Sequence, residues 1–416
     1  MKKVTLGILR EGKIPVDHRV PFDPAQAAAI QKDYPGVEVL CERSEIRCFE
    51  DEEYSNAGII VSEDINACDI LFGVKEVPAD LLIDGKTYFF FSHTIKAQPY
   101  NRDLLREILR KKITLIDYEV LRDTSGKRLV AFGRYAGIVG AYNGIRTYGQ
   151  RYGLYDLRRA SDCFDLNELK EEYSKIDLPA IRIALTGSGR VAYGAMEVLS
   201  EMGISKVTPE EYLSGSFDKP VYTQLRSLDY NRRQDGQSLG SKDFYENPGE
   251  YTSDFGKYAG KTDLLLACAY WNPEAPVLFS KEDTRKDDFK IKVIADITCD
   301  IEGSIPTTKR PSTIDNPVYD YDPATYSIRP PYSSQEHISV MAVDNLPCEL
   351  PRDASEDFGH DLSQYILPHL FGGDKDGIIA GATICKDGQL TPEYAYLQDF
   401  VNGEDNVESI VVSTSK

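Results

Sequence analysis

The chain has 416 residues, of which 41% are hydrophobic, and it carries a formal net charge of −19. This length exceeds what one hydrophobic core usually serves and favours two or three domains. The negative charge argues against nucleic acid or an anionic membrane as a partner, because phosphate groups would be repelled, but it does not exclude a small anionic substrate held by a few arginines in a cleft.

The eight cysteines are scattered and include no CxxC pair. This pattern fits reduced thiols in a cytosolic protein better than a disulfide framework or a zinc site. The apolar stretch "VTLGIL" near the start is too short for the hydrophobic region of a signal peptide, and nowhere do about 18 apolar residues run together. We therefore expect a soluble, cytoplasmic protein that holds no metal.

The first 130 residues alternate short apolar runs with amphipathic helical patterns. The helical patterns include "DPAQAAAIQKDYP" and "YNRDLLREILRKK". The predicted strands are "VTLGILR", "VEVLCE", "GIIVS", "ILFGV", "YFFFS" and "ITLIDYE". Strands that are apolar on both faces and separated by helices predict a parallel sheet covered on both sides.

The segment "FGRYAGIVGAYNGIRTYGQRYG" (residues 132–153) is rich in small and aromatic residues. Its glycines would weaken an isolated helix, so a helix here must be held by close packing. We place this helix between two domains.

A second α/β region begins at "IRIALTGSGRVAYGAMEVLSEMG" (residues 181–203). Residues 181–185 form a predicted strand, and the apolar residues that follow recur at helical spacing before Gly203, which suits a C′ position. Further predicted strands are "PVYTQL", "DLLLACAYW" and "KIKVIADIT". Residues 227–262 are polar and glycine-rich and indicate a long loop or an insertion with short helices.

The string "GSGRVA" (residues 187–192) follows the predicted strand and opens the helix, as a GxGxxA dinucleotide fingerprint requires. Gly187 permits the tight turn, and Gly189 lets backbone amides approach a pyrophosphate at the helix N-terminus. The alternative is a plain strand–turn–helix junction. The predicted cofactor-binding residues are Gly187, Ser188, Gly189, Arg190 and Val191.

The second strand of such a fold should end in an acid that binds the ribose hydroxyls. The segment "ISKVTPEEYL" offers only Glu210 or Glu211, beyond Pro209. The choice between NAD and NADP therefore stays open.

Lys75 and His93 each come directly after or close behind an apolar run that predicts a buried strand. Ligands of open α/β sheets bind outside the carboxyl ends of the strands, where both side chains would lie. A desolvated lysine and a histidine could handle two separate proton transfers. The alternative is a solvated lysine at a strand end and a histidine that caps a turn.

Two further segments carry polar candidates. "ILREGKIPVDHRVPFDP" contains Arg10, His18 and Arg19, whose guanidinium groups suit carboxylates, although an ordinary surface loop fits as well. "IADITCDIEGS" ends a predicted strand with Asp296 and Asp300, which would either contact a nucleotide or cap the next turn.

These residues together resemble the saccharopine dehydrogenases: the lysine-forming enzyme of fungi and the lysine–ketoglutarate reductase half of the bifunctional animal and plant protein. The strings that carry the resemblance are "DHRVPFDP", "FGVKE", "FFFSHTIKAQ", "DYEVL", "KRLVAFGRYAG", "TGSGRVAYGA", "DITCDIEGSI" and "VDNLPCELPRDASEDFG". The family is grouped with alanine dehydrogenase and the soluble part of transhydrogenase. The tail "GATICKDGQLTPEYAYLQDF" looks most like the reductase half.

The resemblance implies three catalytic residues. Lys75 matches the lysine that accepts the proton of the secondary amine, and His93 matches the histidine that acts as acid–base while water adds to the imine. Glu119 matches an acid that tunes the lysine.

The resemblance also implies binding residues. Arg19, Arg128 and Arg134 match arginines near the substrate carboxylates, and Asp300 matches an aspartate near the nicotinamide. Two departures stand out: the reductases usually show two arginines where this chain has His18–Arg19, and the fungal aspartate that selects the cofactor has no clear match.

The resemblance implies two Rossmann-like, doubly wound parallel-sheet domains that face each other across a cleft. We expect residues 1–133 with 346–416 to form the substrate domain and residues 134–345 the dinucleotide-binding domain. The expected reaction joins L-lysine and 2-oxoglutarate into saccharopine with NAD or NADP and without a metal. The alternatives are another amino-acid dehydrogenase, such as alanine dehydrogenase, and a catalytically inactive nucleotide-binding protein. A homo-oligomer stays possible.

Overall fold

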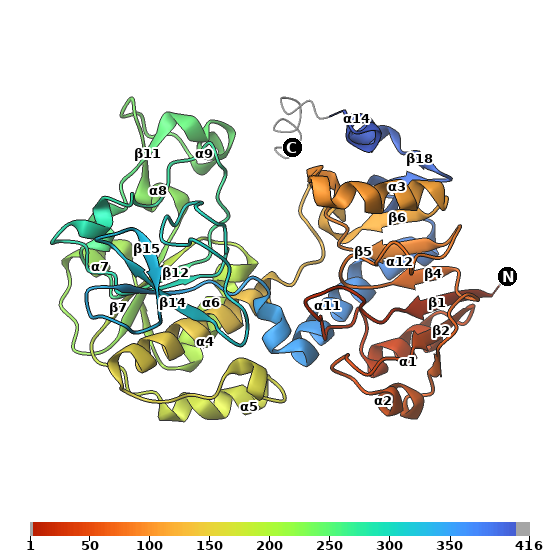
Figure 1. Ribbon diagram of the computed structural model, residues 1–416, viewed down its shortest axis with the longest axis horizontal. Helices are drawn as coiled ribbons and strands as arrows, with labels where there is room; N and C mark the ends of the chain where they lie inside the picture. The colour runs from red at the N-terminus through yellow and green to blue at the C-terminus, as the bar shows by residue number, and fades with distance from the viewer. Residues whose placement is uncertain (1–2, 405–416) are drawn as a thin grey trace. The chain divides into compact units, whose positions relative to one another are not determined.

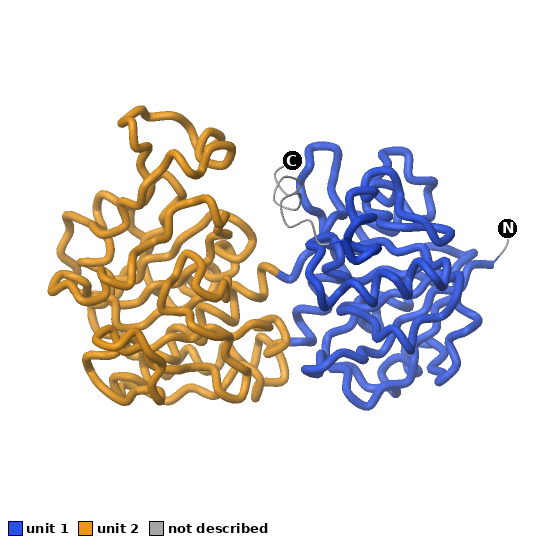
Figure 2. Tube along the Cα trace, turned by 45° about the horizontal axis from the view of Figure 1, so that its top comes forward, with its two compact units in different colours: residues 1–132, 351–416 blue, residues 133–350 orange. Residues whose placement is uncertain are grey.

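The computed structural model describes residues 3–404, and the chain divides into two compact units (Figure 2). Unit 1 combines Met1–Phe132 with Pro351–Lys416, and unit 2 is Gly133–Leu350. Within the described residues, each unit is built on one eight-stranded sheet with helices packed on it (Figure 1). The predicted pair of Rossmann-like α/β folds is confirmed.

The sheet of unit 1 has the order β18-β17-β6-β5-β4-β1-β2-β3. Strands β1 to β6 pair in parallel, and β17 and β18 add an antiparallel edge. The strands are β1 (Val4–Ile8), β2 (Val37–Glu42), β3 (Ile60–Ser62), β4 (Ile70–Phe72), β5 (Thr87–Phe90), β6 (Thr114–Asp117), β17 (Thr383–Lys386) and β18 (Gln389–Leu390). Because β1, β4, β5 and β6 are neighbours and parallel, their carboxyl ends meet at one edge of the sheet.

The helices of unit 1 are α1 (Pro24–Asp33), α2 (Asp51–Asn56), α3 (Arg102–Arg110), α11 (Pro351–Tyr365), α12 (Leu367–Gly372), α13 (Ile378–Gly381) and α14 (Gln398–Asn402). Helix α1 begins where the sequence provides a complete N-terminal signal: Asp23 caps the helix in a capping box with Gln26, and Pro24 takes the first position.

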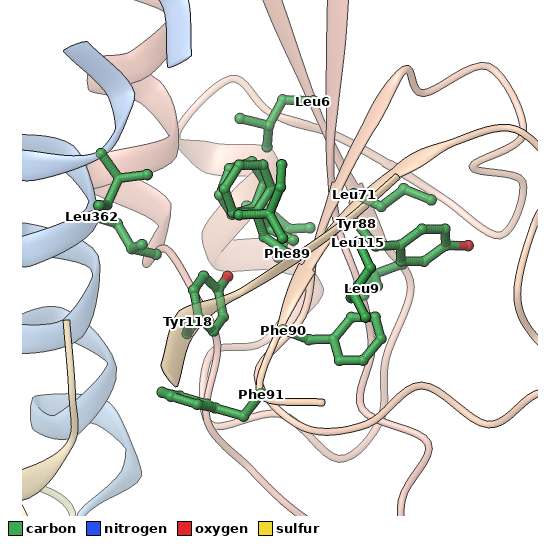
Figure 3. Packing of buried hydrophobic residues seen from close by; sticks show 14 of the residues in the cluster. Leu6, Leu9, Leu71, Tyr88, Phe89, Phe90, Phe91, Leu115, Tyr118 and Leu362 are labelled. Atoms are coloured by element: carbon green, nitrogen blue, oxygen red, sulfur yellow. The ribbon is translucent and has the colours of Figure 1, made fainter. Parts of the chain in front are cut away.

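The core of unit 1 combines aromatic and aliphatic side chains, many of them from the central strands (Figure 3). Phe89 and Phe90 of β5 and Tyr118 after β6 are fully buried, and Leu362 of α11 packs into the same cluster. Each such side chain contributes about 1.5–3 kcal/mol when it is removed from water. Helix α11, which comes after unit 2 in the chain, is therefore an integral part of the core of the unit 1 sheet.

The sheet of unit 2 has the order β15-β14-β16-β13-β12-β7-β9-β8, and β14 pairs antiparallel with both of its neighbours, β15 and β16. Its strands are β7 (Arg182–Thr186), β8 (Ser205–Val207), β9 (Val221–Leu225), β12 (Leu264–Ala267), β13 (Val293–Asp296), β14 (Val318–Asp322), β15 (Ser327–Arg329) and β16 (Ile338–Met341). Strand β9 lies between β7 and β8, so the strand that follows the fingerprint helix in the chain is not the one that borders β7.

The helices of unit 2 are α4 (Gly133–Tyr152), α5 (Leu166–Glu171), α6 (Arg190–Glu201), α7 (Pro209–Ser214), α8 (Ser227–Tyr230), α9 (Ser241–Glu246) and α10 (Gly256–Ala259). The region predicted as an insertion with short helices holds α8, α9 and α10. It also holds a small antiparallel pair of strands that the sequence did not predict, β10 (Asn231–Arg233) and β11 (Tyr251–Ser253).

Helix α4 packs backbone to backbone against α6. A Cβ atom on Gly137 would lie 1.9 Å from the Val191 carbonyl oxygen, and one on Gly194 would lie 2.0 Å from the Arg134 carbonyl oxygen. No side chain fits at either position. The glycines that weaken α4 as an isolated helix are thus what lets it contact α6 closely.

Candidate active site

Polar side chains follow the parallel strands at the carboxyl-terminal edge of the unit 1 sheet. Glu11 comes after β1, Lys75 after β4, His93 after β5 and Glu119 after β6. These strands are direct neighbours in the order β6-β5-β4-β1. The structure therefore places the three predicted catalytic residues on one edge, where open α/β sheets bind their ligands.

Lys75 is half-buried, and its backbone N–H donates to Glu11 Oε2 at 2.8 Å. Within residues 3–404, no carboxylate forms an ion pair with its ammonium group. The pKa of Lys75 is lowered from the usual 10.5, first by burial and then by the positive charge of Arg19, while Asp17 and Glu76 oppose the change. A lysine with a lowered pKa is a better acceptor and donor of protons near neutral pH.

His93 is held by Glu76, the residue after Lys75. Glu76 Oε1 lies 2.6 Å from His93 Nδ1, and Glu76 Oε2 accepts from Lys13 Nζ at 2.6 Å. This contact fixes the ring through Nδ1 and leaves Nε2 for a reacting molecule. His93 has a φ of +54°, which turns the chain sharply after β5, and its ring stacks beside Phe91.

The pKa of Glu76 is set by two opposing effects. Burial alone would raise it, but the hydrogen bonds from His93 and Lys13 outweigh burial and hold the pKa at about 2. Glu76 is therefore ionised throughout the physiological range and gives His93 a permanent negative partner.

Arg19 lies in a buried ion pair. Its Nε and one terminal nitrogen donate to the two oxygens of Asp17 at 2.9 and 2.6 Å, and its guanidinium lies 4.1 Å from the ring centroid of Phe132. The side chains of Arg19 and Asp17 are 3% and 1% exposed. Asp17 thus fixes the orientation of the arginine that the resemblance assigns to a substrate carboxylate.

Glu119 lies in the short 3₁₀ helix η3 (Tyr118–Val120) behind β6. Its Oε1 forms an ion pair with Lys96 at 3.2 Å, while its buried Oε2 has no hydrogen-bond partner among the described residues. Its backbone N–H donates to Asp117 at 2.7 Å. The free oxygen of Glu119 is an acceptor available to a bound ligand.

The other two predicted substrate-binding arginines lie in different units. Arg128 of unit 1 donates through Nε to the Val130 carbonyl at 3.0 Å, with its guanidinium beside the ring of Phe91. Arg134 belongs to α4 of unit 2, where it binds both oxygens of Glu197 at 3.0 and 2.7 Å. The ion pair of Arg134 with Glu197 therefore links α4 to α6.

The fingerprint in unit 2 adopts the strand–turn–helix geometry that was predicted. Gly187 has a φ of +103°, and a Cβ on it would lie 3.0 Å from the Cys268 carbonyl oxygen. Gly189 is the N-cap of α6, its missing Cβ faces open space, and Ser188 is exposed. The backbone N–H groups of Arg190 and Val191 begin the helix. This turn has room beside Gly189, and it lies at a helix N-terminus, where backbone amides favour an anion such as a pyrophosphate.

The acid expected to bind the ribose hydroxyls was looked for after β8, which is not the strand next to β7. Glu210 and Glu211 follow β8, but β9 is the strand that borders β7. Glu211 also closes the capping box of α7 through the Thr208 N–H. Strand β9 ends at Leu225 and is followed by the exposed Arg226. Because β9 comes later in the chain but pairs first, a reading in chain order could not identify it.

The two aspartates after β13 differ in their surroundings. Asp296 is fully buried and accepts hydrogen bonds from the Thr298 and Thr308 hydroxyls, both at 2.6 Å, so it ties the following loop together. Asp300 is half-buried in that loop, and its carbonyl accepts from the Gly303 N–H at 3.0 Å. The cofactor role of Asp300 stays a prediction.

Three residues of the edge were not among the predicted site residues: Glu11, Asp17 and Glu76. Each lies within a segment that was singled out, in "REGK", "DHR" and "VKE". The signal was available, since an acid beside a candidate lysine, histidine or arginine is a natural partner. Which acid meets which base depends on the turns after the strands.

Two absences concern the described residues. Within residues 3–404 there is no group of three or more His, Cys, Asp or Glu side chains able to hold a metal ion. No helix in the same range is long and apolar enough to cross a membrane.

Comparison with known proteins gives a consistent picture. Residues 7–139 match the family model described as "Alanine dehydrogenase/PNT, N-terminal domain". The alpha-aminoadipic semialdehyde synthase of Mus musculus is 31% identical over an alignment that covers all of this chain and 50% of the mouse protein. The lysine-forming, NAD(+) saccharopine dehydrogenase of Yarrowia lipolytica is 26% identical over 87% of this chain and 90% of that protein.

The resemblance predicted from the motifs is thereby confirmed. The chain spans about half the length of the curated animal relatives that it matches. Among solved structures, an L-alanine dehydrogenase superposes with a TM-score of 0.64 at 16% identity, over 96% of this chain and 100% of that one. This likeness shows the shared two-domain fold.

Proposed function

We propose that the chain catalyses the reversible condensation L-lysine + 2-oxoglutarate + NAD(P)H + H⁺ = saccharopine + NAD(P)⁺ + water. The observation that carries the proposal is the edge of the unit 1 sheet, where Lys75, Glu76-bound His93 and Glu119 follow neighbouring strands. The relatives of this chain include proteins named for saccharopine and for alpha-aminoadipic semialdehyde.

The side chains of unit 1 would move the protons of this reaction. Loss of water from the carbinolamine needs an acid near the leaving oxygen, and His93 Nε2 is the free nitrogen of a ring held at Nδ1. Lys75 would give a proton to the nitrogen that becomes the secondary amine, and would take it back in the reverse direction. Its lowered pKa suits both tasks.

Unit 2 would hold the dinucleotide at the turn Gly187–Gly189 and the first amides of α6. When bound, the cofactor supplies the hydride that reduces the imine carbon. Saccharopine carries three carboxylates, and we assign their recognition to arginines, with Arg19 and Arg128 in unit 1 and Arg134 in unit 2 as the candidates. Asp17 keeps the first of these in one orientation.

For the cofactor, the surroundings of β9 favour NADP over NAD. The strand that borders β7 is followed by Arg226, and an arginine at this point accommodates a ribose 2′-phosphate, whereas an acid binds the free hydroxyls. The carboxylate of Asp229, three residues further along the chain, already accepts the Arg226 backbone N–H at 2.6 Å. Ser227 Oγ, 3.1 Å from the Tyr245 hydroxyl, adds a polar group beside it.

The reaction is tested by following the absorbance of NADPH or NADH with lysine plus 2-oxoglutarate. We expect oxidation that needs both substrates and falls about 10²–10⁴-fold in Lys75→Met, the range of a lost acid–base group. Lys86→Met is the matched control, because Lys86 is also half-buried in unit 1 but binds the Asn66 carbonyl at the opposite edge of the sheet. Oxidation with pyruvate plus ammonium instead would favour an alanine dehydrogenase, and tight cofactor binding without turnover would favour a sensor.

The cofactor preference is tested separately by quenching of protein fluorescence. Wild-type protein should bind NADPH more tightly than NADH, and Arg226→Gln should weaken NADPH about 10-fold or more while leaving NADH unchanged. Lys242→Gln, which removes another exposed cation of unit 2, should change neither affinity. Equal affinities of the wild-type protein for the two cofactors would refute the preference.

A further inference from the structure

Glu11 uses both carboxylate oxygens to hold the backbone that carries Lys75. Its Oε1 accepts from the Val74 N–H at 2.7 Å and its Oε2 from the Lys75 N–H at 2.8 Å. Backbone pairing with the chain that follows β5 reaches only the carbonyl of Val74: the Gly73 N–H donates to the Phe89 carbonyl, and the Val74 carbonyl accepts from the Phe91 N–H. The side-chain oxygens of Glu11 therefore take the place of a neighbouring strand as hydrogen-bond acceptors for the backbone that follows β4.

Ending a strand with a buried carboxyl group costs free energy. Glu11 is only 8% exposed, and no described cation lies within ion-pair distance of its carboxylate. Burial first, and then the negative charge of Asp17, raise its pKa to about 8. A buried carboxyl group costs free energy unless its hydrogen bonds compensate, so neutral groups would have ended the strand at lower cost.

We propose that Glu11 is a positioning residue, which fixes the backbone of Lys75 at the sheet edge and so keeps its side chain in a partly buried place. The inference rests on the proposed function only in the role given to Lys75. The hold on the Lys75 backbone is a property of the structure and is measurable without substrate.

The consequence for Lys75 follows from what surrounds it. Burial is the first cause of its lowered pKa, and the cations Arg19 and Lys13 add to it, while Asp17 and Glu76 act in the opposite direction. The charged and titratable groups that face Glu11 itself are Asp17, Arg19 and Tyr118, besides the Lys75 backbone. If the backbone loosens, the ammonium becomes better solvated and its pKa rises toward the usual value.

The test compares Glu11→Gln with the wild-type protein. Glutamine keeps the size of the side chain but has one acceptor oxygen, so one of the two N–H groups faces an amide donor. The first readout is the rate of Lys75 acylation by acetic anhydride against pH, followed by mass spectrometry. We expect the midpoint to rise by about 0.5 or more, and kcat for saccharopine formation to fall about 10-fold or more while NADPH affinity stays unchanged.

Asp69→Asn is the matched control. Asp69 also accepts a backbone N–H of this sheet, from Thr5 at 2.9 Å, but at the end opposite to Lys75. It should leave the acylation midpoint and kcat unchanged. A Glu11→Gln protein with the wild-type acylation midpoint would overturn the proposal, whatever its activity.

Two further outcomes are distinguishable. A wild-type protein that does not turn over lysine and 2-oxoglutarate sinks the proposed function, but the acylation readout still decides the role of Glu11. If Glu11→Gln does not fold, the comparison is replaced by a measurement of hydrogen exchange at the Lys75 amide of the wild-type protein. Protection of that amide no greater than that of unpaired loop amides would then overturn the proposal.

Discussion

Replacing Glu76 by glutamine removes the negative partner shared by His93 and Lys13. The pKa of Glu76 falls from the usual 4.5 to about 2 in the folded protein. At about 1.4 kcal/mol for each pKa unit, this difference is equivalent to about 3 kcal/mol of folding free energy. Because glutamine keeps neutral hydrogen bonds to the same groups, we expect Glu76→Gln to lose about 2–3 kcal/mol at pH 7.

The pH dependence gives the sharper test. A group whose pKa is lowered by folding stabilises the protein above its unfolded pKa and loses that contribution as the pH falls toward the folded value. The difference between wild type and Glu76→Gln should therefore be full at pH 7 and about half as large at pH 3. Urea unfolding of unit 1 is followed by circular dichroism, and the single tryptophan, Trp271 of unit 2, is an internal fluorescence reference.

Glu53→Gln is the control for this experiment. Glu53 binds Arg352 at 2.6 Å, but its side chain is 37% exposed, so removing its charge should cost at most about 1 kcal/mol. A Glu76→Gln effect no larger than this, or one that stays constant between pH 7 and pH 3, would refute the reasoning.

Three more predictions follow from the same geometry. The rate of saccharopine oxidation should rise with pH through a midpoint below 10.5, because the neutral form of Lys75 accepts the proton and the pKa of Lys75 is lowered. A pH–rate profile of the wild-type protein, compared with that of Lys75→Met, checks this. Gly137→Ala should destabilise unit 2 by about 3 kcal/mol or more in thermal unfolding, because the new Cβ would lie 1.9 Å from the Val191 carbonyl oxygen. The control, Gly256→Ala, has open space around the new Cβ and should be neutral or slightly stabilising. Gly187→Ala should weaken NADPH binding about 10-fold or more in a fluorescence titration, because its φ of +103° is unfavourable for alanine; unchanged affinity would refute the role of this turn.

The sequence was sufficient to identify the strands and the strand ends that carry candidate catalytic residues. The predicted strand at residues 70–74 is β4, and the one at residues 88–91 is β5, each within a residue or two of its observed bounds. Apolar runs reveal such strands because both faces of a parallel sheet are buried. The order of the strands was less accessible: β9 inserts between β7 and β8, and no local pattern records which later strand pairs first.

The contacts of the edge were beyond sequence reasoning for a related reason. Glu76 is adjacent to Lys75 in the chain, yet it binds His93, 17 positions away, and Lys13, 63 positions away. Turn conformations after each strand decide these pairings, among them the left-handed backbone of His93. The motifs predicted the acid and base types, while the pairing of each acid is a property of the tertiary structure.

Two glutamates on this edge show why pairing matters more than residue type. Glu11 and Glu76 are both 8% exposed, and Glu11 binds the Lys75 backbone while Glu76 is the next residue in the chain, yet the pKa of Glu11 is about 8 and that of Glu76 is about 2. Glu11 accepts from neutral backbone N–H groups and faces Asp17, whereas Glu76 accepts from Lys13 and His93. The edge therefore has one carboxyl group whose protonated form is favoured by burial, next to the Lys75 backbone, and one that stays ionised beside His93. This division fits the roles that we propose, because the ionised Glu76 holds the His93 ring through Nδ1 while Glu11 holds the backbone of Lys75.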